Sequence, residues 1–332
     1  MMRLAGLAKT LLLLGAAGCA VPAQAQAPVP VPAQYPNRSI RMIVPFAPGG
    51  SADLVARVLA KTIGEQMGQN MVIDNRGGAN GYIGADMAAK ASPDGYTVLY
   101  NTSIMIFSRH IESKLNHDLF RDFEPIALTA TVPQILIVPP AFPAKNLKEF
   151  IEHVRANPGK LNYASIGSTN IASLTTLLFL NIHKLSAQLV PYNASGTAYL
   201  DLVGGRMDFY FGTVAAAAPF VKDNRLRGIA VTSLQRTKVL PDVPTLDESG
   251  MPKFEATAWQ GMLTSAKTPA AIVNRINAEI IKALKNPELQ RQFEAQGTLP
   301  LGSTPKEYGE YLRREDERWG KIISDAHLKP GS

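Results

Sequence analysis

Short β-rich runs in this chain alternate with segments whose apolar residues recur at helical spacing. The run IRMIV at Ile40–Val44 predicts a strand, and the apolar positions between 54 and 63 predict one face of a helix. This alternation continues along most of the chain. It predicts an α/β fold with largely parallel sheets, and the length of 332 residues suggests about two domains.

The remaining elements follow from the same periodicity and from turn and cap signals. Asn146 with Glu149, and Thr304 with Glu307, are typical of capped helix starts. Further strands are predicted at 71–73, 97–100, 134–138, 161–165, 189–190, 207–211, 229–232 and 257–263, and helices at 83–91, 171–183, 197–203, 214–221 and through most of the chain after 263.

The first 25 residues have the pattern of a signal peptide. Arg3 and Lys9 give a positive start, an apolar stretch covers 11–21, and Ala-Gln-Ala at 23–25 matches a cleavage site. We therefore expect export to the periplasm, followed by a Pro-rich linker over 26–35.

Cys19 is the only cysteine, which excludes a disulfide framework and a cysteine-based zinc site. The residues before it resemble a lipoprotein cleavage box, except that Ala16 stands where leucine is expected. Lipid anchoring at Cys19 is therefore the less favoured alternative to soluble export.

The net charge of +7 does not gather in one patch. Arg3 and Lys9 leave with the signal peptide, which lowers the charge to +5, and the basic residues of the last helix alternate with acidic ones. Because no basic run contains stacking aromatic residues, we expect no nucleic-acid binding. No apolar run is long enough to span a bilayer.

The segment PFAPGGSAD at 45–53 lies between a predicted strand and a predicted helix. Its glycines permit close backbone approach, and the helix start offers unpaired N–H groups to an anion. The segment lacks the lysine and spacing of a nucleotide P-loop. An ordinary strand–helix turn capped by Ser51 remains the alternative.

Three further strand ends carry small polar residues, at 101–103, 165–170 and 212–213. Ligands of open α/β sheets bind outside the carboxyl ends of strands. Each segment alone predicts no more than a polar turn. Together they indicate a crevice of hydroxyls, amides and backbone N–H groups that suits a carboxylate.

Evidence for catalysis is weak. No two of the five histidines have the i, i+4 spacing of a helical metal site, and no G-x-S-x-G motif occurs. Ser51 with Asp53 is the nearest approach to a catalytic pair, without a histidine that can be placed beside it. We expect no enzyme activity, no metal and no cofactor.

Some larger side chains have two interpretations. Three arginines could bind a carboxylate ligand or form exposed salt bridges, and four aromatic residues could line a pocket or pack in the core. These residues are Arg57, Arg76 and Arg109, and Tyr82, Tyr192, Phe211 and Trp259.

A series of short motifs resembles the Bug family, the extracytoplasmic receptors of tripartite tricarboxylate transporters (TctC-like). They occur in family order over about 35–325. They are YP at 35–36, IVPFAPGG at 43–50 with Asp53, DNR at 74–76, SPDGYT at 92–97, FRDFEP at 120–125, LNYAS at 161–165, VPY at 190–192, LVGG at 202–205 with Asp208, AVT at 230–232 and LPDVPT at 240–245.

The resemblance implies a type II periplasmic-binding-protein fold, in which two α/β lobes are joined by crossover strands near 134–138 and 257–263. It implies that residues 36–135 plus 260–332 form lobe 1 and 136–259 form lobe 2. It also implies a small carboxylate held by amides and hydroxyls. The site residues carried over are Phe46, Ala47, Gly49, Gly50, Ser51, Asp53, Asn101, Thr102, Ser103, Ser165, Gly167, Ser168, Thr169, Asn170, Tyr192, Gly212 and Thr213.

Three positions depart from the family pattern. Ile171 stands in place of a histidine, Asn193-Ala194 in place of a basic residue and glycine, and Gly212 in place of a frequent acidic residue. Because all three changes remove polarity or charge, we predict a ligand less polar than citrate, such as an aromatic or longer-chain mono- or dicarboxylate.

The resemblance implies a monomeric receptor that closes its lobes over the carboxylate and delivers it to the permease subunits of a tripartite transporter. An orphan sensor that presents the same ligand to a membrane kinase remains an alternative. An exported enzyme on the same fold is the least favoured one.

Overall fold

The computed structural model describes residues 35–112, 115–166, 170–192 and 195–325. The predicted signal peptide over 1–25 and all but the last residue of the predicted linker lie outside these ranges. Within them, no helix is long and apolar enough to cross a membrane.

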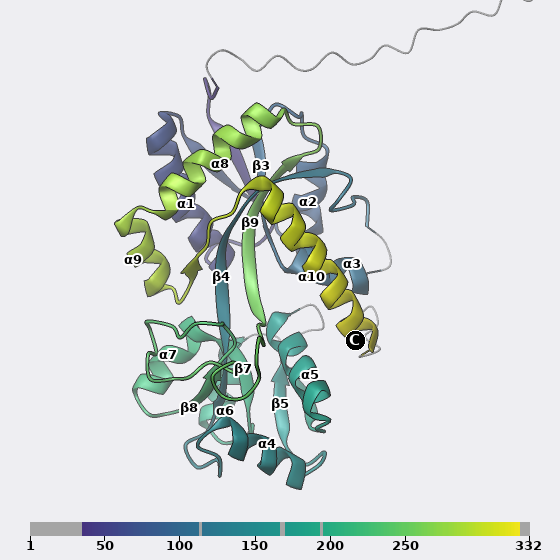
Figure 1. Ribbon diagram of the computed structural model, residues 1–332, viewed down its shortest axis with the longest axis vertical. Coiled ribbons are helices and arrows are strands. Elements are labelled where there is room, and N and C mark those ends of the chain that lie inside the picture. Colours follow the sequence, from purple (N-terminus) through teal and green to yellow (C-terminus); the bar gives the residue numbers. More distant parts are fainter. Residues whose placement is uncertain (1–34, 113–114, 167–169, 193–194, 326–332) are drawn as a thin grey trace, which may run out of the picture. The chain divides into compact units, whose positions relative to one another are not determined.

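Parallel strands form one part of the larger sheet (Figure 1). β1 (Ile40–Val44) lies between β2 (Met71–Asn75) and β3 (Thr97–Thr102), and pairs with both in parallel. Its side chains alternate between two faces: Met42 and Val44 belong to one buried cluster, and Ile43 to the other.

Helices cover both faces of this sheet. One face packs against α1 (Ser51–Met67), α8 (Ala270–Leu284) and α9 (Pro287–Ala295). The other packs against α2 (Tyr82–Ala89), α3 (Ile104–Ile111) and α10 (Pro305–Asp325). A 3₁₀ turn at Ala79–Gly81 precedes α2, and the short β10 (Leu299–Pro300) pairs with β4.

Two long strands connect the lobes, β4 (Phe123–Val138) and β9 (Thr257–Ser265). β4 pairs with β9 along residues 123–133, and its last residues pair with β7 (Tyr210–Thr213) and β8 (Arg227–Val231). One strand therefore belongs to both lobes, as Figure 1 shows. The crossovers implied near 134–138 and 257–263 fall on these two strands.

The second lobe is built around the end of β4. Ile135 and Ile137 face α6 (Ser195–Val203) and α7 (Val214–Lys222), whereas Leu136 and Val138 belong to the cluster that contains α4 (Leu147–Ala156) and α5 (Ile171–His183). A separate parallel pair, β5 (Asn162–Ser165) with β6 (Gln188–Pro191), completes it.

The prediction of largely parallel sheets is wrong. Five of the eight strand pairings among the described residues are antiparallel, and four of these five involve β4. The alternation of strands and helices cannot show this, because direction is set where β4 and β9 cross between the lobes in opposite senses. The strand predicted at 134–138 is the end of β4, and α3 was not predicted.

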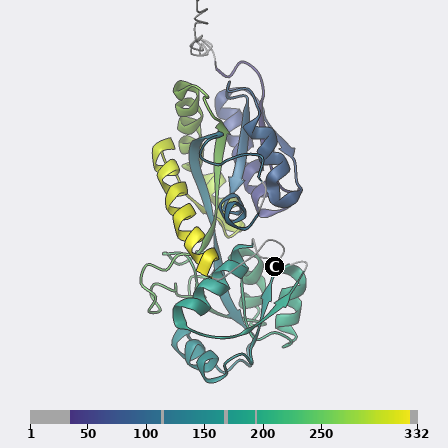
Figure 2. The ribbon, with the colours of Figure 1, turned by 90° about the vertical axis from the view of Figure 1, so that its right-hand side faces the viewer.

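The last helix begins and packs as its sequence directs. Thr304 Oγ1 accepts a hydrogen bond from the Glu307 N–H, and the Glu307 carboxylate accepts one from the Thr304 N–H, which confirms the capping box. α10, yellow in Figure 2, packs against α3 and β4. Its Tyr308 hydroxyl donates to Asn101 Oδ1 over 2.8 Å.

A close approach between α10 and β9 gives the first prediction. A Cβ at Gly261 would lie 2.1 Å from the Tyr308 hydroxyl oxygen and 2.9 Å from the Ala127 carbonyl oxygen. We expect Gly261→Ala to lower the free energy of unfolding by about 3 kcal/mol, measured by urea titration.

Gly309→Ala is the matched control. Its Cβ would meet Pro125 Cγ at an ordinary 3.4 Å, and alanine favours a helix interior by up to about 1 kcal/mol. Equal stability of the two variants would contradict the packing argument.

Candidate ligand-binding site

Residues of both lobes line a cavity of about 250 Å³. It lies at the ends of β1, β3 and β7 and beside the crossover strands. The lining residues are Phe46, Gly50, Ser51, Ala52, Thr102, Ser103, Ile104, Val132, Asn170, Ile171, Thr213, Ala258, Trp259 and Gln260. Seven of the predicted site residues are among them: Phe46, Gly50, Ser51, Thr102, Ser103, Asn170 and Thr213.

The turn between β1 and α1 is shaped by Asp53. This residue is 1 % exposed, and its carboxylate accepts hydrogen bonds from the Gly49 N–H, from Arg57 Nε and from Asn75 Nδ2, each at 2.9 Å. Gly49 has φ +87°, a conformation that favours glycine. Asp53, Gly49 and Ala47 thus do not line the cavity; Asp53 and Gly49 hold the turn that does.

Burial alone would raise the pKa of the Asp53 carboxyl. The hydrogen bonds from Arg57, Gly49 and Asn75 outweigh burial and hold this pKa below its ordinary value. Asp53 is therefore an ionised anchor for the turn at neutral pH.

Four helices begin at the cavity. Gly50 is the N-cap of α1 and Ser103 that of α3, and neither makes a side-chain cap bond. Asn170 caps α5 through the Ala172 N–H, and Thr213 caps α7 through the Ala216 N–H. Helix N-termini carry partial positive charge and unpaired N–H groups, so their convergence favours an anion.

No charged side chain lines the cavity among the residues that the structure describes. The three candidate arginines bind protein carboxylates: Arg57 pairs with Asp53 at 2.9 Å, Arg76 with Asp74 at 2.8 Å, and Arg109 with Asp118 and Asp316. Their role here is salt bridging.

Four further predicted residues do not line the cavity. Asn101 accepts from Tyr308, Ser165 Oγ lies 2.8 Å from Ser173 Oγ, and the Tyr192 hydroxyl donates to Asp201 over 2.8 Å. A Cβ on buried Gly212 would lie 2.1 Å from the Tyr199 hydroxyl, so packing explains this glycine. Gly167, Ser168 and Thr169 lie outside the described residues.

The crossover strands contribute residues that the strand-end argument missed. Val132, Ala258 and Gln260 come from them, and Ala52 and Ile104 from helix starts. Of the candidate aromatic residues, Trp259 lines the cavity, whereas Tyr82, Tyr192 and Phe211 do not. The sequence pattern could have indicated Gln260, because it is a polar residue within the largely apolar strand predicted at 257–263.

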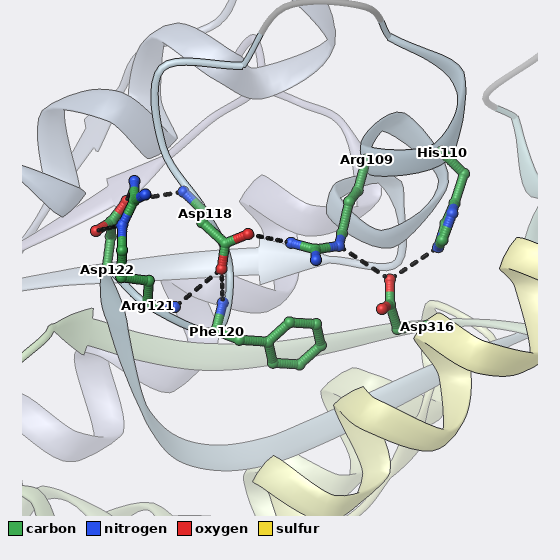
Figure 3. A network of polar contacts seen from close by, with 7 residues as sticks. All are labelled: Arg109, His110, Asp118, Phe120, Arg121, Asp122 and Asp316. Atoms are coloured by element: carbon green, nitrogen blue, oxygen red, sulfur yellow. Dashed lines mark hydrogen bonds and ion pairs between the residues drawn. The ribbon is translucent and has the colours of Figure 1, made fainter.

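A network at the far end of α3 holds this helix in place (Figure 3). His110 Nε2 and Arg109 Nε lie 2.8 Å and 3.3 Å from Asp316 Oδ1 on α10, and Arg109 also pairs with Asp118. Burial would raise the pKa of Asp118, but Arg109 and backbone N–H donors lower it. These contacts join the end of α3 to α10 and to Asp118.

A larger cavity of about 460 Å³ lies elsewhere, between residues 233–239, α9 and β10. It contains none of the predicted strand-end residues and no helix start of the kind described above. The smaller cavity is therefore the candidate site. Among the described residues, no group of three or more acidic, histidine or cysteine side chains could hold a metal ion.

Comparisons with known proteins show the family. A family model described as the tripartite tricarboxylate transporter family receptor matches residues 55–328. The chain belongs to this family of receptors. It is 32% identical to protein BugT of Bordetella pertussis, over 96% of each chain. It is thus a solute-binding receptor of the TctC/Bug family.

Two solved structures share the fold. Rpa4515 of R. palustris with adipate has a TM-score of 0.76 and 30% identity, over 89% of this chain and 99% of that one. MatC of Rhodopseudomonas palustris with bound malate has a TM-score of 0.71 and 30% identity, over 87% and 100%. The predicted family and the predicted two-lobed periplasmic-binding fold are confirmed.

The buried Asp53 carboxylate, which holds the turn between β1 and α1, gives the second prediction. Asp53→Asn replaces a carboxylate that accepts three hydrogen bonds, and we expect a loss of about 1–3 kcal/mol of unfolding free energy at pH 7. The control Asp325→Asn breaks an exposed pair with Lys321 and should cost less than about 1 kcal/mol.

The pH dependence follows from the lowered pKa of Asp53. Its contribution is complete above the unfolded-state pKa of about 3.9 and is lost as the pH falls through the lower folded-state pKa. Denaturant titrations should show the gap between wild type and Asp53→Asn narrowing below about pH 4. A constant gap would contradict this role.

Proposed function

We propose that this receptor captures a small organic carboxylate between its lobes and delivers it to the membrane permease of a tripartite tricarboxylate-type transporter. The convergence of four helix N-termini on a cavity with hydroxyl and amide side chains carries the proposal. Such a site stabilises negative charge without a cationic side chain. Adipate and malate in the related structures support this ligand class.

The cavity also has an apolar part. Ile104 and Ile171 begin two of the helices, and Val132 and Ala258 are paired across β4 and β9. Of the three departures from the family pattern, Ile171 lines the cavity, Gly212 does not, and 193–194 lie outside the described residues. We propose a ligand less polar than citrate, either an aromatic acid or a longer-chain mono- or dicarboxylate.

Capture by lobe closure completes the proposal. Residues 46–51 present the anion site of lobe 1, over 36–135 and 260–332, and the loops that begin α5 and α7 close over the ligand from lobe 2, over 136–259. Closure would be a hinge motion about β4 and β9. The mature protein would be a periplasmic monomer, exported by the signal peptide over 1–25, that releases its ligand unchanged.

A ligand screen is the third prediction. Thermal unfolding with citrate, aspartate, malate, adipate, benzoate and phenylacetate should show the largest rise in Tm for the less polar acids, because a ligand that binds only the native state stabilises it. Tight calorimetric binding of citrate or aspartate, with no response to the less polar acids, would contradict the proposed preference. Chromatography of the incubated ligand should recover it unchanged.

The fourth prediction places a charge at the anion site. Ser51→Asp puts a carboxylate at the first residue of α1, where helix formation tolerates it, but like-charge repulsion should weaken carboxylate binding about 100-fold or more. Ala270→Asp adds the same charge at the exposed first residue of α8, outside the cavity. Unchanged affinity in a folded Ser51→Asp variant would reject the site.

A further inference from the structure

Gln260 links the crossover strand β9 to the anion-binding turn. This residue is 3 % exposed, and its Nε2 lies 3.3 Å from Ser51 Oγ. Its Oε1 accepts a hydrogen bond from the Tyr100 hydroxyl over 3.0 Å. Both ends of the amide therefore have partners, one on α1 and one on β3.

The hydrogen bonds run in one direction, from Tyr100 to the Gln260 side chain and from there to Ser51. Because the Tyr100 hydroxyl donates to Oε1, the NH₂ group of Gln260 faces Ser51, and an amide NH₂ can only donate. Thr129 Oγ1 lies 3.0 Å from the Tyr100 hydroxyl and donates over 3.0 Å to the backbone carbonyl oxygen of Gln260.

The bond from Gln260 changes which hydrogen bonds the Ser51 hydroxyl can make. Its oxygen accepts from Gln260, so its own hydrogen is not needed there and can point toward a ligand. A serine with no such partner can rotate and present either its hydrogen or its lone pairs. Held in this way, Ser51 keeps its hydrogen available for a ligand, which suits an anion better than a ligand group that must itself donate.

We infer that Gln260 is a positioning residue that fixes the Ser51 hydroxyl as a hydrogen-bond donor and so makes the site selective for anionic ligands. This inference rests on the proposed function and deepens it. Gln260 acts through Ser51. Of the side chains hydrogen-bonded to it, only Tyr100 titrates, and burial raises the pKa of Tyr100. The nearest charged residues on α1, Asp53 and Arg57, pair with each other.

The first experiment measures binding of adipate, malate and phenylacetate by calorimetry at pH 8 and pH 5.5. Gln260→Met removes both side-chain bonds at similar length, and we expect about fivefold weaker binding of each acid that wild type binds, the effect of about one hydrogen bond. Gln260→Glu turns the donor into a charged acceptor that attracts the Ser51 hydrogen, and about 100-fold weaker binding is expected at pH 8.

Recovery of binding at low pH distinguishes a positioning role of Gln260 from a purely structural one. A carboxyl group buried at position 260 has a raised pKa, and its protonated form can again donate to Ser51 while accepting from Tyr100. Relative to wild type and to the exposed control Gln235→Glu, the affinity of Gln260→Glu should therefore recover at least tenfold at pH 5.5. The inference would be overturned if Gln260→Glu bound the acids as tightly as wild type at pH 8, or if its affinity did not recover at pH 5.5.

An experiment without ligand distinguishes a failure of the proposed carboxylate binding from a failure of the proposed role of Gln260. The protein is labelled with ¹⁵N-glutamine, and the Nε2 protons of Gln260 are assigned as the signals that are absent in Gln260→Met. Ser51→Ala removes the acceptor of these protons. Their exchange with solvent should therefore be at least about fivefold faster in Ser51→Ala than in wild type. Unchanged exchange would reject the link. If wild type binds none of the three acids while exchange responds as expected, the ligand class fails and the Gln260–Ser51 link stands.

Discussion

The antiparallel pairing of β4 with β9 joins the two lobes and positions everything built on them. The two strands pair from Phe123 to Pro133, and β4 then continues without a break into the second lobe. From Ile126 onward every residue of β4 is buried. Because the lobes share a strand, their positions are coupled through backbone hydrogen bonds, and the cavity forms where this pairing ends.

That arrangement explains why four helices begin at one place. In each lobe, a strand ends at the cavity and a helix starts there, as with β1 and α1, or β7 and α7. The strand-end rule of α/β proteins applies to each lobe separately. Two lobes joined face to face by β4 and β9 turn two such edges toward each other, so their helix N-termini surround a common space.

Much of this could be predicted from sequence because it is local. Caps such as Asn146 and Thr304, and the strand ends at Ser51, Ser103, Asn170 and Thr213, depend on residues adjacent in the chain. What was missed depends on tertiary packing. The strand directions, the Gln260–Ser51 bond and the Asp53–Asn75 bond join residues far apart in the chain, and no local pattern encodes these contacts.

The absence of charged side chains along the described lining has an energetic consequence for the proposed mechanism. Helix termini and hydroxyls are weak partners for an anion in water, where their partial charges are screened. They become effective when water is excluded, because the local dielectric then falls. A site of this kind should hold a carboxylate weakly while the lobes are apart and more strongly once they meet. An arginine in the cavity would attract anions in either state, so in the proposed mechanism the neutral lining makes recognition depend on closure.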